Sequence, residues 1–148
     1  MQVLLLLLAT YALLLVVIPI LLLIFSFADN PSFHRTPNMR DDAAIFRAIV
    51  LAPILETFFI QFLVFKVFQL FNNRRCYDGW YILTSAILFG IMHTYNIPYM
   101  INTFFIGIVL AYGIYFYKRQ PAKAFWTVTL IHALRNAIST ILVFAFSD

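Results

Sequence analysis

Five polar side chains lie inside segments that are otherwise almost wholly apolar. Glu56 interrupts one apolar run and His93 stands near the end of the next, while His132, Arg135 and Asn136 lie together in the last. An ionisable side chain costs several kcal/mol inside a lipid bilayer, so its presence in such a segment indicates a function. These residues are therefore the first candidates for a reactive site.

The chemistry that these groups support is attack of water on an amide bond. Glu56 can act as a general base toward water, and His93 can share that water or hold Glu56 ionised. His132 and Asn136 are i and i+4, on one face of a helix. Both can donate hydrogen bonds to the oxyanion that forms on the attacked carbonyl.

The same side chains leave a second kind of site open. Glu56, His93 and His132 could hold a divalent metal such as zinc, because Glu and His are ordinary zinc ligands. The sequence has no His-Glu-x-x-His helix of the metalloprotease kind. Its single cysteine, Cys76, gives no thiolate pair. The residues alone do not decide whether a metal takes part.

Three further side chains are spaced to support the candidate site. Phe89 is four residues before His93, so its ring is expected to pack over the imidazole and fix its rotamer. Thr57 and Gln61 have the same spacing beside Glu56, and we expect them to form a neutral hydrogen-bonded pair.

Each of these residues also has a purely structural interpretation. Glu56 could be a structural carboxylate paired with Arg135 across the bundle, which would also keep it ionised. A lone histidine on an apolar helix is more often a hydrogen-bonded core residue, and Asn136 could simply bridge two helices. The functional interpretation is favoured because these residues occur together.

The composition excludes an ordinary soluble domain. Hydrophobic residues make up 64% of the 148 residues and charged residues 11%, and phenylalanine alone occurs 17 times. A water-soluble domain of this size could not bury so much apolar surface. The net charge of +4 comes from basic residues at the ends of apolar runs, which is typical of membrane orientation signals. The sequence has no basic stripe with aromatic side chains, so it does not predict nucleic-acid binding.

The apolar runs predict an all-α fold, a polytopic transmembrane bundle of about five spans. We expect spans at about 3–27, 44–71, 80–96, 98–117 and 124–146, with a kink at Pro53. We expect residues 1–43 to form the first span and a polar loop, and residues 44–148 to form a four-helix core that carries the candidate hydrolytic site. The distribution of Lys and Arg places the N-terminus in the cytoplasm and the C-terminus outside.

Three short motifs resemble those of the type II CAAX prenyl protease family. This group is also called the CPBP or bacteriocin-processing family, and it includes lysostaphin-resistance-like proteins. The family's Glu-Glu-x-x-x-Arg motif, often preceded by Ala-Pro, is matched by residues 52–61, Ala-Pro-Ile-Leu-Glu-Thr-Phe-Phe-Ile-Gln. Phe-x-x-x-His is matched by residues 89–93, and His-x-x-x-Asn by residues 132–136. The resemblance covers roughly residues 44–146.

Two positions depart from the family pattern. Thr57 stands where the second Glu is expected, and Gln61 where the Arg is expected. The family's two residues are spaced to form an ion pair, so the substitution pair replaces it by neutral hydrogen bonding with no net change of buried charge. The replacement of the family's Glu and Arg by Thr57 and Gln61 is therefore consistent with an intact site.

The resemblance implies an intramembrane endopeptidase that cuts a membrane-associated or prenylated protein or peptide. It implies that Glu56 and His93 activate water and that His132 and Asn136 form the oxyanion site. It also implies a multi-pass protein, which we expect in a bacterial cytoplasmic membrane. Two alternatives are a non-catalytic scaffold or bacteriocin self-immunity factor of the same fold, and a small proton-coupled transporter.

Overall fold

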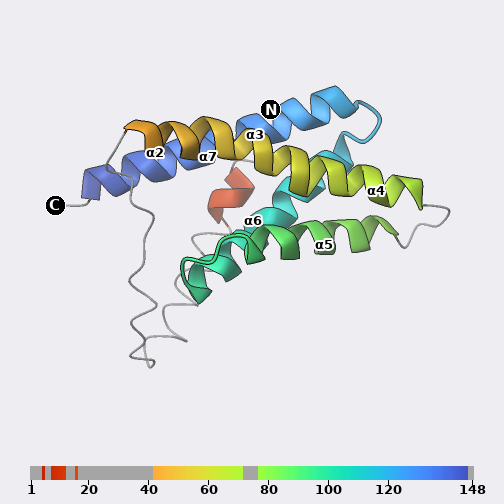
Figure 1. Ribbon diagram of the computed structural model, residues 1–148, viewed down its shortest axis with the longest axis horizontal. Coiled ribbons are helices and arrows are strands. Elements are labelled where there is room, and N and C mark those ends of the chain that lie inside the picture. The colour runs from red at the N-terminus through yellow and green to blue at the C-terminus, as the bar shows by residue number, and fades with distance from the viewer. Residues whose placement is uncertain (1–4, 6–7, 13–15, 17–41, 72–76, 147–148) are drawn as a thin grey trace.

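The computed structural model describes residues 5, 8–12, 16, 42–71 and 77–146. Every element within these ranges is a helix and none is a strand, so the prediction of an all-α fold is confirmed for this part of the chain. Figure 1 shows the helices running back and forth along one long axis. The predicted first span, 3–27, and the polar loop to residue 41 lie largely outside the described residues. The proposed division at residue 43 stays a prediction.

The first helix of the core runs without interruption from Asp42 to Leu70. It alternates between α-helical and π-helical turns, in the order α2 (Asp42–Phe46), η2 (Arg47–Leu51), α3 (Ala52–Glu56), η3 (Thr57–Leu63) and α4 (Val64–Leu70). Two π-helical stretches in one helix are unusual, and such stretches often mark functional sites. Glu56 is the last residue between the two stretches.

Pro53 accounts for the first π-helical stretch. Proline has no N–H to donate and its ring clashes with the carbonyl one turn earlier, so a regular α-helix cannot continue through it unchanged. Here the Ala52 N–H bonds to the carbonyl of Arg47, five residues back. The helix therefore widens just before the proline and continues past it, which is how it accommodates the predicted kink.

Three more helices complete the described core: α5 (Tyr77–Ile91), α6 (Ile97–Phe116) and α7 (Pro121–Phe146). Asn96 caps the N-terminus of α6, since its side chain accepts a hydrogen bond from the Tyr99 N–H at 2.8 Å. The prediction that the span 80–96 extends to residue 96 is therefore wrong. Its helix stops at Ile91, and His93 lies in the turn that follows.

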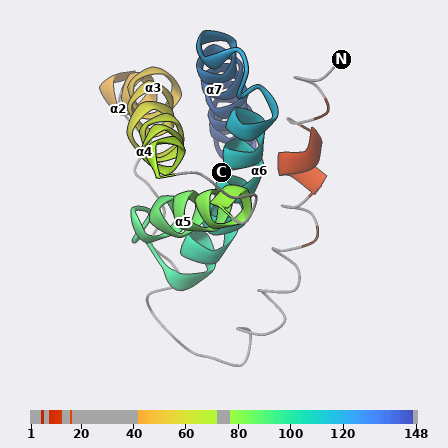
Figure 2. The ribbon, with the colours of Figure 1, turned by 90° about the vertical axis from the view of Figure 1, so that its right-hand side faces the viewer.

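The helices pack in two closely associated pairs. Figure 2 shows α2–α4 beside α7, with α5 and α6 below them. Two glycines permit the close approach of α5 and α6: a Cβ at Gly107 would lie 2.9 Å from Ala86 Cα, and one at Gly90 would lie 3.0 Å from Phe104 Cβ. The centre of the core is built mainly from large buried side chains, namely Tyr81, Phe89, Ile106, Leu110, Ile114 and Ile131.

Two of the described helices, Asp42–Leu70 and Ile97–Phe116, are long and apolar enough to cross a membrane. The apolar part of α5 is shorter. Helix α7 is long but carries Thr129, His132, Arg135 and Asn136, which lower its hydropathy. Many large apolar side chains are exposed on the surface, as lipid contact requires. The count of five spans stays a prediction.

Candidate active site

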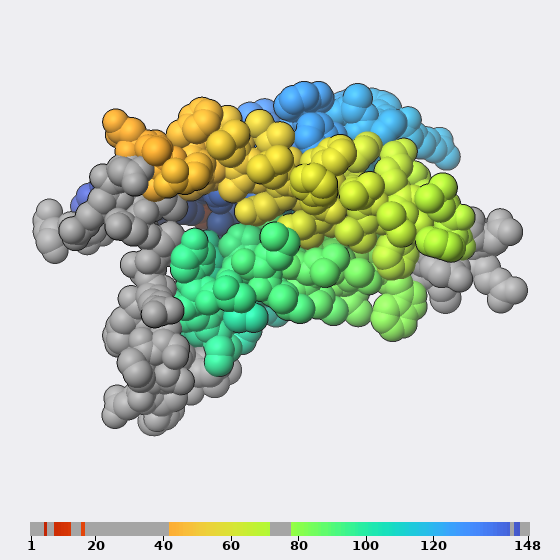
Figure 3. Space-filling model, viewed as in Figure 1, coloured from red at the N-terminus to blue at the C-terminus, as the bar shows by residue number. Residues whose placement is uncertain are grey.

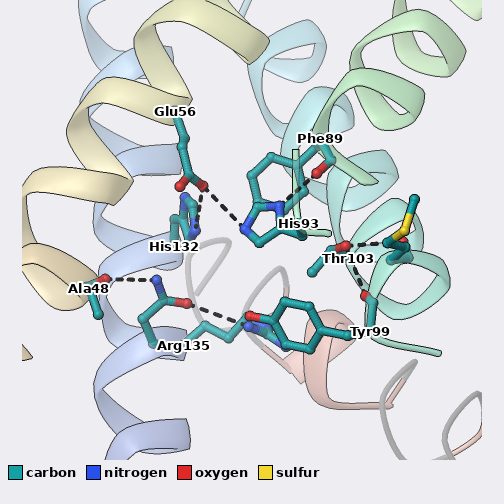
Figure 4. A network of polar contacts seen from close by, with 10 residues as sticks. Ala48, Glu56, Phe89, His93, Tyr99, Thr103, His132 and Arg135 are labelled. Carbon is teal, nitrogen blue, oxygen red and sulfur yellow. Dashed lines mark hydrogen bonds and ion pairs between the residues drawn. The ribbon is translucent and has the colours of Figure 1, made fainter. Parts of the chain in front are cut away.

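The structure brings Glu56, His93 and His132 together from three separate elements. Glu56 Oε2 lies 3.7 Å from His93 Nε2 and 3.6 Å from His132 Nε2, as Figure 4 shows. The Glu56 side chain is 20% exposed and that of His93 15%, whereas that of His132 is only 3% exposed. The carboxylate therefore lies between a buried and a partly accessible imidazole.

The ring of His93 is held in one orientation by Phe89. His93 Nδ1 lies 2.6 Å from the Phe89 carbonyl oxygen, which can only accept, so Nδ1 carries a proton. The Phe89 ring packs against both imidazoles, with centroids 4.6 Å from His93 and 5.3 Å from His132. Phe89 thus positions His93, as its spacing predicts, and also contacts His132. A neutral His93 then directs the lone pair of Nε2 toward Glu56.

Asn136 lies one turn along α7 from His132 and connects α7 to the start of the long helix. Its Nδ2 donates to the carbonyl of Ala48 at 2.8 Å, and its Oδ1 accepts from Arg135 Nη1 at 3.4 Å. One amide N–H is therefore engaged with Ala48. The imidazole of His132 has a buried Nδ1 without a hydrogen-bond partner within the described residues.

The structural alternative for Glu56, an ion pair with Arg135, is not formed in the described part of the chain. Among the described residues, the ionisable side chains within 4 Å of the Glu56 carboxylate are the imidazoles of His93 and His132. Arg135 is only 7% exposed, and its Nε has no hydrogen-bond partner in this part of the chain. Its backbone carbonyl accepts a hydrogen bond from the Tyr11 hydroxyl at 3.0 Å. Figure 4 shows the Tyr99 ring facing the guanidinium, and the two groups interact electrostatically.

The hydrogen bond expected between Thr57 and Gln61 is also not formed. Gln61 Oε1 is instead 2.5 Å from the Ser85 hydroxyl on α5, while Gln61 Nε2 and Thr57 Oγ1 are buried without partners in the described structure. The Tyr81 hydroxyl donates to the backbone carbonyl of Gln61 at 3.1 Å. The reason is that both residues lie in η3, where π-helical turns no longer stack positions four apart.

Ser85 and Tyr81 are residues that the sequence argument missed. Their spacing of four on α5 was a usable signal, since it places two polar groups on one face of an otherwise apolar helix. Together they hold η3 against α5. Gln61 thus belongs to a helix-packing network rather than to a pair with Thr57.

A metal site was the other chemistry left open by the sequence. In the part of the chain that the structure describes, no group of three His, Cys, Asp or Glu side chains has an arrangement that could hold a metal ion. The two imidazoles converge on one carboxylate oxygen of Glu56. As they stand, Glu56, His93 and His132 do not form a ready ligand set.

Comparison with known protein families identifies the class to which this helical chain belongs. The model of the type II CAAX prenyl endopeptidase Rce1-like family matches residues 42–138, which is more than half of the chain. The chain therefore belongs to the Rce1-like family of membrane-embedded CAAX-type proteases. No curated protein and no solved structure matches it.

Proposed function

We propose that the protein is an intramembrane endopeptidase that hydrolyses a peptide bond in a membrane-associated or prenylated (CAAX-type) protein or peptide. The observation that carries the proposal is the environment of Glu56 Oε2. This buried oxygen has no hydrogen-bond partner among the described residues and lies 3.6–3.7 Å from two imidazole nitrogens. These separations are too long for direct hydrogen bonds. The oxygen is therefore free to accept a hydrogen bond from a water bound beside the two imidazoles.

The proposed reaction begins with that water. Glu56 accepts one of its protons while the water oxygen bonds to the substrate carbonyl carbon, and the carbonyl electron pair moves onto oxygen. His93, fixed through its Nδ1, orients the water through Nε2. His132 and Asn136 are proposed to donate hydrogen bonds to the oxyanion. The C–N bond then breaks as the electron pair returns, and Glu56 gives its proton to the leaving amine.

The depth and opening of the site support a substrate that is held in the membrane. Glu56 lies at the middle of the helix Asp42–Leu70, which is long enough to cross a bilayer. Figure 3 shows the surface hollowed between α2–α3 and the start of α6, with side chains of α7 at the base of the hollow. Glu56 and His93 are both partly exposed, so the site is not closed off from a substrate chain.

The test is cleavage of a broad pool of lipidated and membrane-anchored peptides by the protein in proteoliposomes. New peptide termini are read by mass spectrometry for wild type, for Glu56→Gln and for Asp78→Asn. Asp78 is a matched control, since its carboxylate accepts from Tyr115 and pairs with Lys118, away from Glu56. We expect cleavage by wild type and Asp78→Asn, and a loss of about 10²–10⁴-fold in Glu56→Gln.

Other outcomes separate the alternative functions. Parallel reactions with a chelator show whether cleavage needs a metal ion. If folded wild-type protein cuts nothing, and Glu56→Gln retains any cellular phenotype of the wild type, the protein is a non-catalytic scaffold or immunity factor instead. In that case Thr57 and Gln61 would mark the loss of the family's chemistry.

A further inference from the structure

The backbone carbonyl of Ala48 on the long helix accepts a hydrogen bond from a side chain of another helix. Asn136 Nδ2, on α7, donates to this carbonyl at 2.8 Å. Inside a helix a carbonyl ordinarily accepts from the N–H four residues later in an α-turn, or five residues later in a π-turn. For Ala48 these two donors belong to positions 52 and 53, so the residues at those positions decide whether the carbonyl is free.

Neither of the two backbone donors reaches Ala48. The Ala52 N–H bonds to the carbonyl of Arg47, five residues back. Residue 53 is a proline, which has no N–H to donate. A backbone carbonyl left unpaired away from water is costly. At this partly buried position the Asn136 side chain supplies the donor that the helix itself withholds.

The second π-helical stretch has a similar arrangement. In an α-helix the carbonyl of Ile60 would accept from the Val64 N–H, but that N–H bonds to the Gln61 carbonyl instead. The Ser85 hydroxyl on α5 lies 2.8 Å from the Ile60 carbonyl, within hydrogen-bond distance. In both stretches, a carbonyl that has lost its α-helical donor therefore faces a polar side chain of a neighbouring helix.

The Asn136 carboxamide is held from two sides by groups of opposite kind. The Ala48 carbonyl can only accept and so selects the NH₂ group, whereas the Arg135 guanidinium can only donate, and its Nη1 lies 3.4 Å from Oδ1. The planar amide therefore has one orientation, and its second N–H is left for another acceptor. Figure 4 shows Ala48 and Glu56 on the face of the long helix that lies toward His132.

We infer that Pro53 is a positioning residue for Asn136. Because the proline withholds a backbone N–H, the Ala48 carbonyl stays free to orient the Asn136 amide, and the second amide N–H is directed before any substrate binds. Donors fixed in advance are the ones that stabilise an oxyanion effectively. The use of this orientation in catalysis rests on the proposed peptidase function, whereas the orientation itself does not.

The first experiment observes the Asn136 amide and does not depend on catalysis. Protein labelled with ¹⁵N-asparagine is placed in phosphatidylcholine nanodiscs, and NMR measures the exchange of the side-chain amide protons with water. The Asn136 signals are assigned by their loss in Asn136→Ala. In the wild type, one Asn136 proton should exchange about 2–10-fold more slowly than the other, because only one of them is bonded to Ala48. Equal exchange of the two protons overturns the inference and needs no variant of Pro53 to fold.

The same measurement on Pro53→Ala tests the role of the proline. Alanine restores a backbone N–H and is the better helix former, so the helix can take up the Ala48 carbonyl itself. We expect the slow Asn136 proton to exchange about 2–10-fold faster than in wild type. Pro121→Ala is the matched control and should leave exchange unchanged, because the first N–H groups of a helix such as α7 have no helical acceptor. Unchanged exchange in Pro53→Ala also overturns the inference.

The second experiment asks whether Pro53 affects cleavage through Asn136. The parameters kcat and KM are measured for wild type, Pro53→Ala, Asn136→Ala and the double variant. We expect kcat to fall about 10²–10³-fold in Asn136→Ala and about 10–100-fold in Pro53→Ala, with KM little changed, since an oxyanion donor acts in the transition state. In the Asn136→Ala background, Pro53→Ala should have no further effect.

The remaining outcomes separate this inference from the proposed function. If the two losses multiply, Pro53 acts on another part of the site, such as the position of Glu56, and the inference is wrong. If folded wild-type protein cuts no peptide, that result counts against the proposed peptidase function alone. The amide exchange of Asn136 then decides the inference by itself.

Discussion

Glu56 contacts two histidines that the protein holds in different ways. His132 lies in the middle of α7 and its side chain is 3% exposed, so it is part of the packed interior. His93 lies in the turn after α5, is more exposed, and is held by one hydrogen bond to Phe89. The two imidazoles therefore lie at nearly the same distance from Glu56 Oε2. They differ in how much each contributes to the stability of the fold.

This difference predicts separate effects of two substitutions. Both His93→Ala and His132→Ala should lower kcat by about 10²–10⁴-fold, because each removes an imidazole from the carboxylate that we propose to activate water. His132→Ala should also lower the free energy of unfolding by about 2–4 kcal/mol, since it leaves a cavity in the core. His93→Ala should change that free energy by less than about 1 kcal/mol. Activity assays and denaturation in mixed micelles measure the two effects.

The contrary result is also informative at this scale. If His93→Ala keeps full activity while His132→Ala loses it, then only the buried imidazole takes part in the reaction. The proposed role of His93 in orienting water would then be wrong.

Thr57 gives a second prediction for a single side chain. Its hydroxyl is buried and has no hydrogen-bond partner among the described residues, which is unfavourable. Replacing it by the nearly isosteric valine should leave the fold intact and raise the free energy of unfolding by about 1 kcal/mol. Ser85→Ala is the comparison, because it removes the donor to Gln61 and should cost about 1–2 kcal/mol. A destabilised Thr57→Val would show that the hydroxyl has a partner after all.

At the scale of the element, the long helix shows what the sequence can and cannot predict. Glu56, His93 and His132 could be chosen from the sequence because each interrupts an apolar run, and lipid forces such groups inward. The predicted pairing of Thr57 with Gln61 was wrong, because the prediction assumed α-helical spacing in a segment that is π-helical. The end of α5 at Ile91 was likewise missed. Residues 92–96, Met-His-Thr-Tyr-Asn, are mostly polar, but the prediction relied on Pro98 as the signal that stops the helix.

The contact between α5 and α6 provides a prediction at this scale. A Cβ at Gly107 would lie 2.9 Å from Ala86 Cα and 3.0 Å from Phe89 Cβ, so Gly107→Ala must move one helix. We expect a loss of about 1–3 kcal/mol in the free energy of unfolding. Activity should fall as well, because Phe89 contacts both histidines. Denaturation and peptide cleavage measure the two losses.

Gly79 offers a matched control for the same substitution. It lies in α5, and a Cβ added there meets nothing within 4 Å. Gly79→Ala should therefore be neutral or stabilise the protein by about 0.5–1 kcal/mol, through helix propensity alone. If both alanine variants behave alike, close packing at Gly107 does not position Phe89.

At the scale of the whole molecule, the lysines at the junction of α6 and α7 and the opening of the site lie toward opposite ends, while Arg47 lies near the start of the long helix. Lys118 and Lys123 stand between α6 and α7 or at the start of α7, with their ammonium groups over the rings of Tyr115 and Tyr117. The turn between α5 and α6, which carries His93, lies at the other end of both helices. Lys and Arg favour the cytoplasmic side. The site should therefore open away from the cytoplasm.

Cysteine labelling in intact cells tests this orientation. Cys76 lies between α4 and α5 in the sequence, next to Arg74 and Arg75 at the basic end. Thr94 is exposed in the turn beside His93, so Thr94→Cys in a Cys76→Ser background reports the site end. A membrane-impermeant maleimide should label the introduced cysteine directly and Cys76 only after permeabilisation. The reverse pattern would place the site toward the cytoplasm and would contradict the predicted orientation. The expected pattern instead favours peptides that reach the site from the outer face of the membrane.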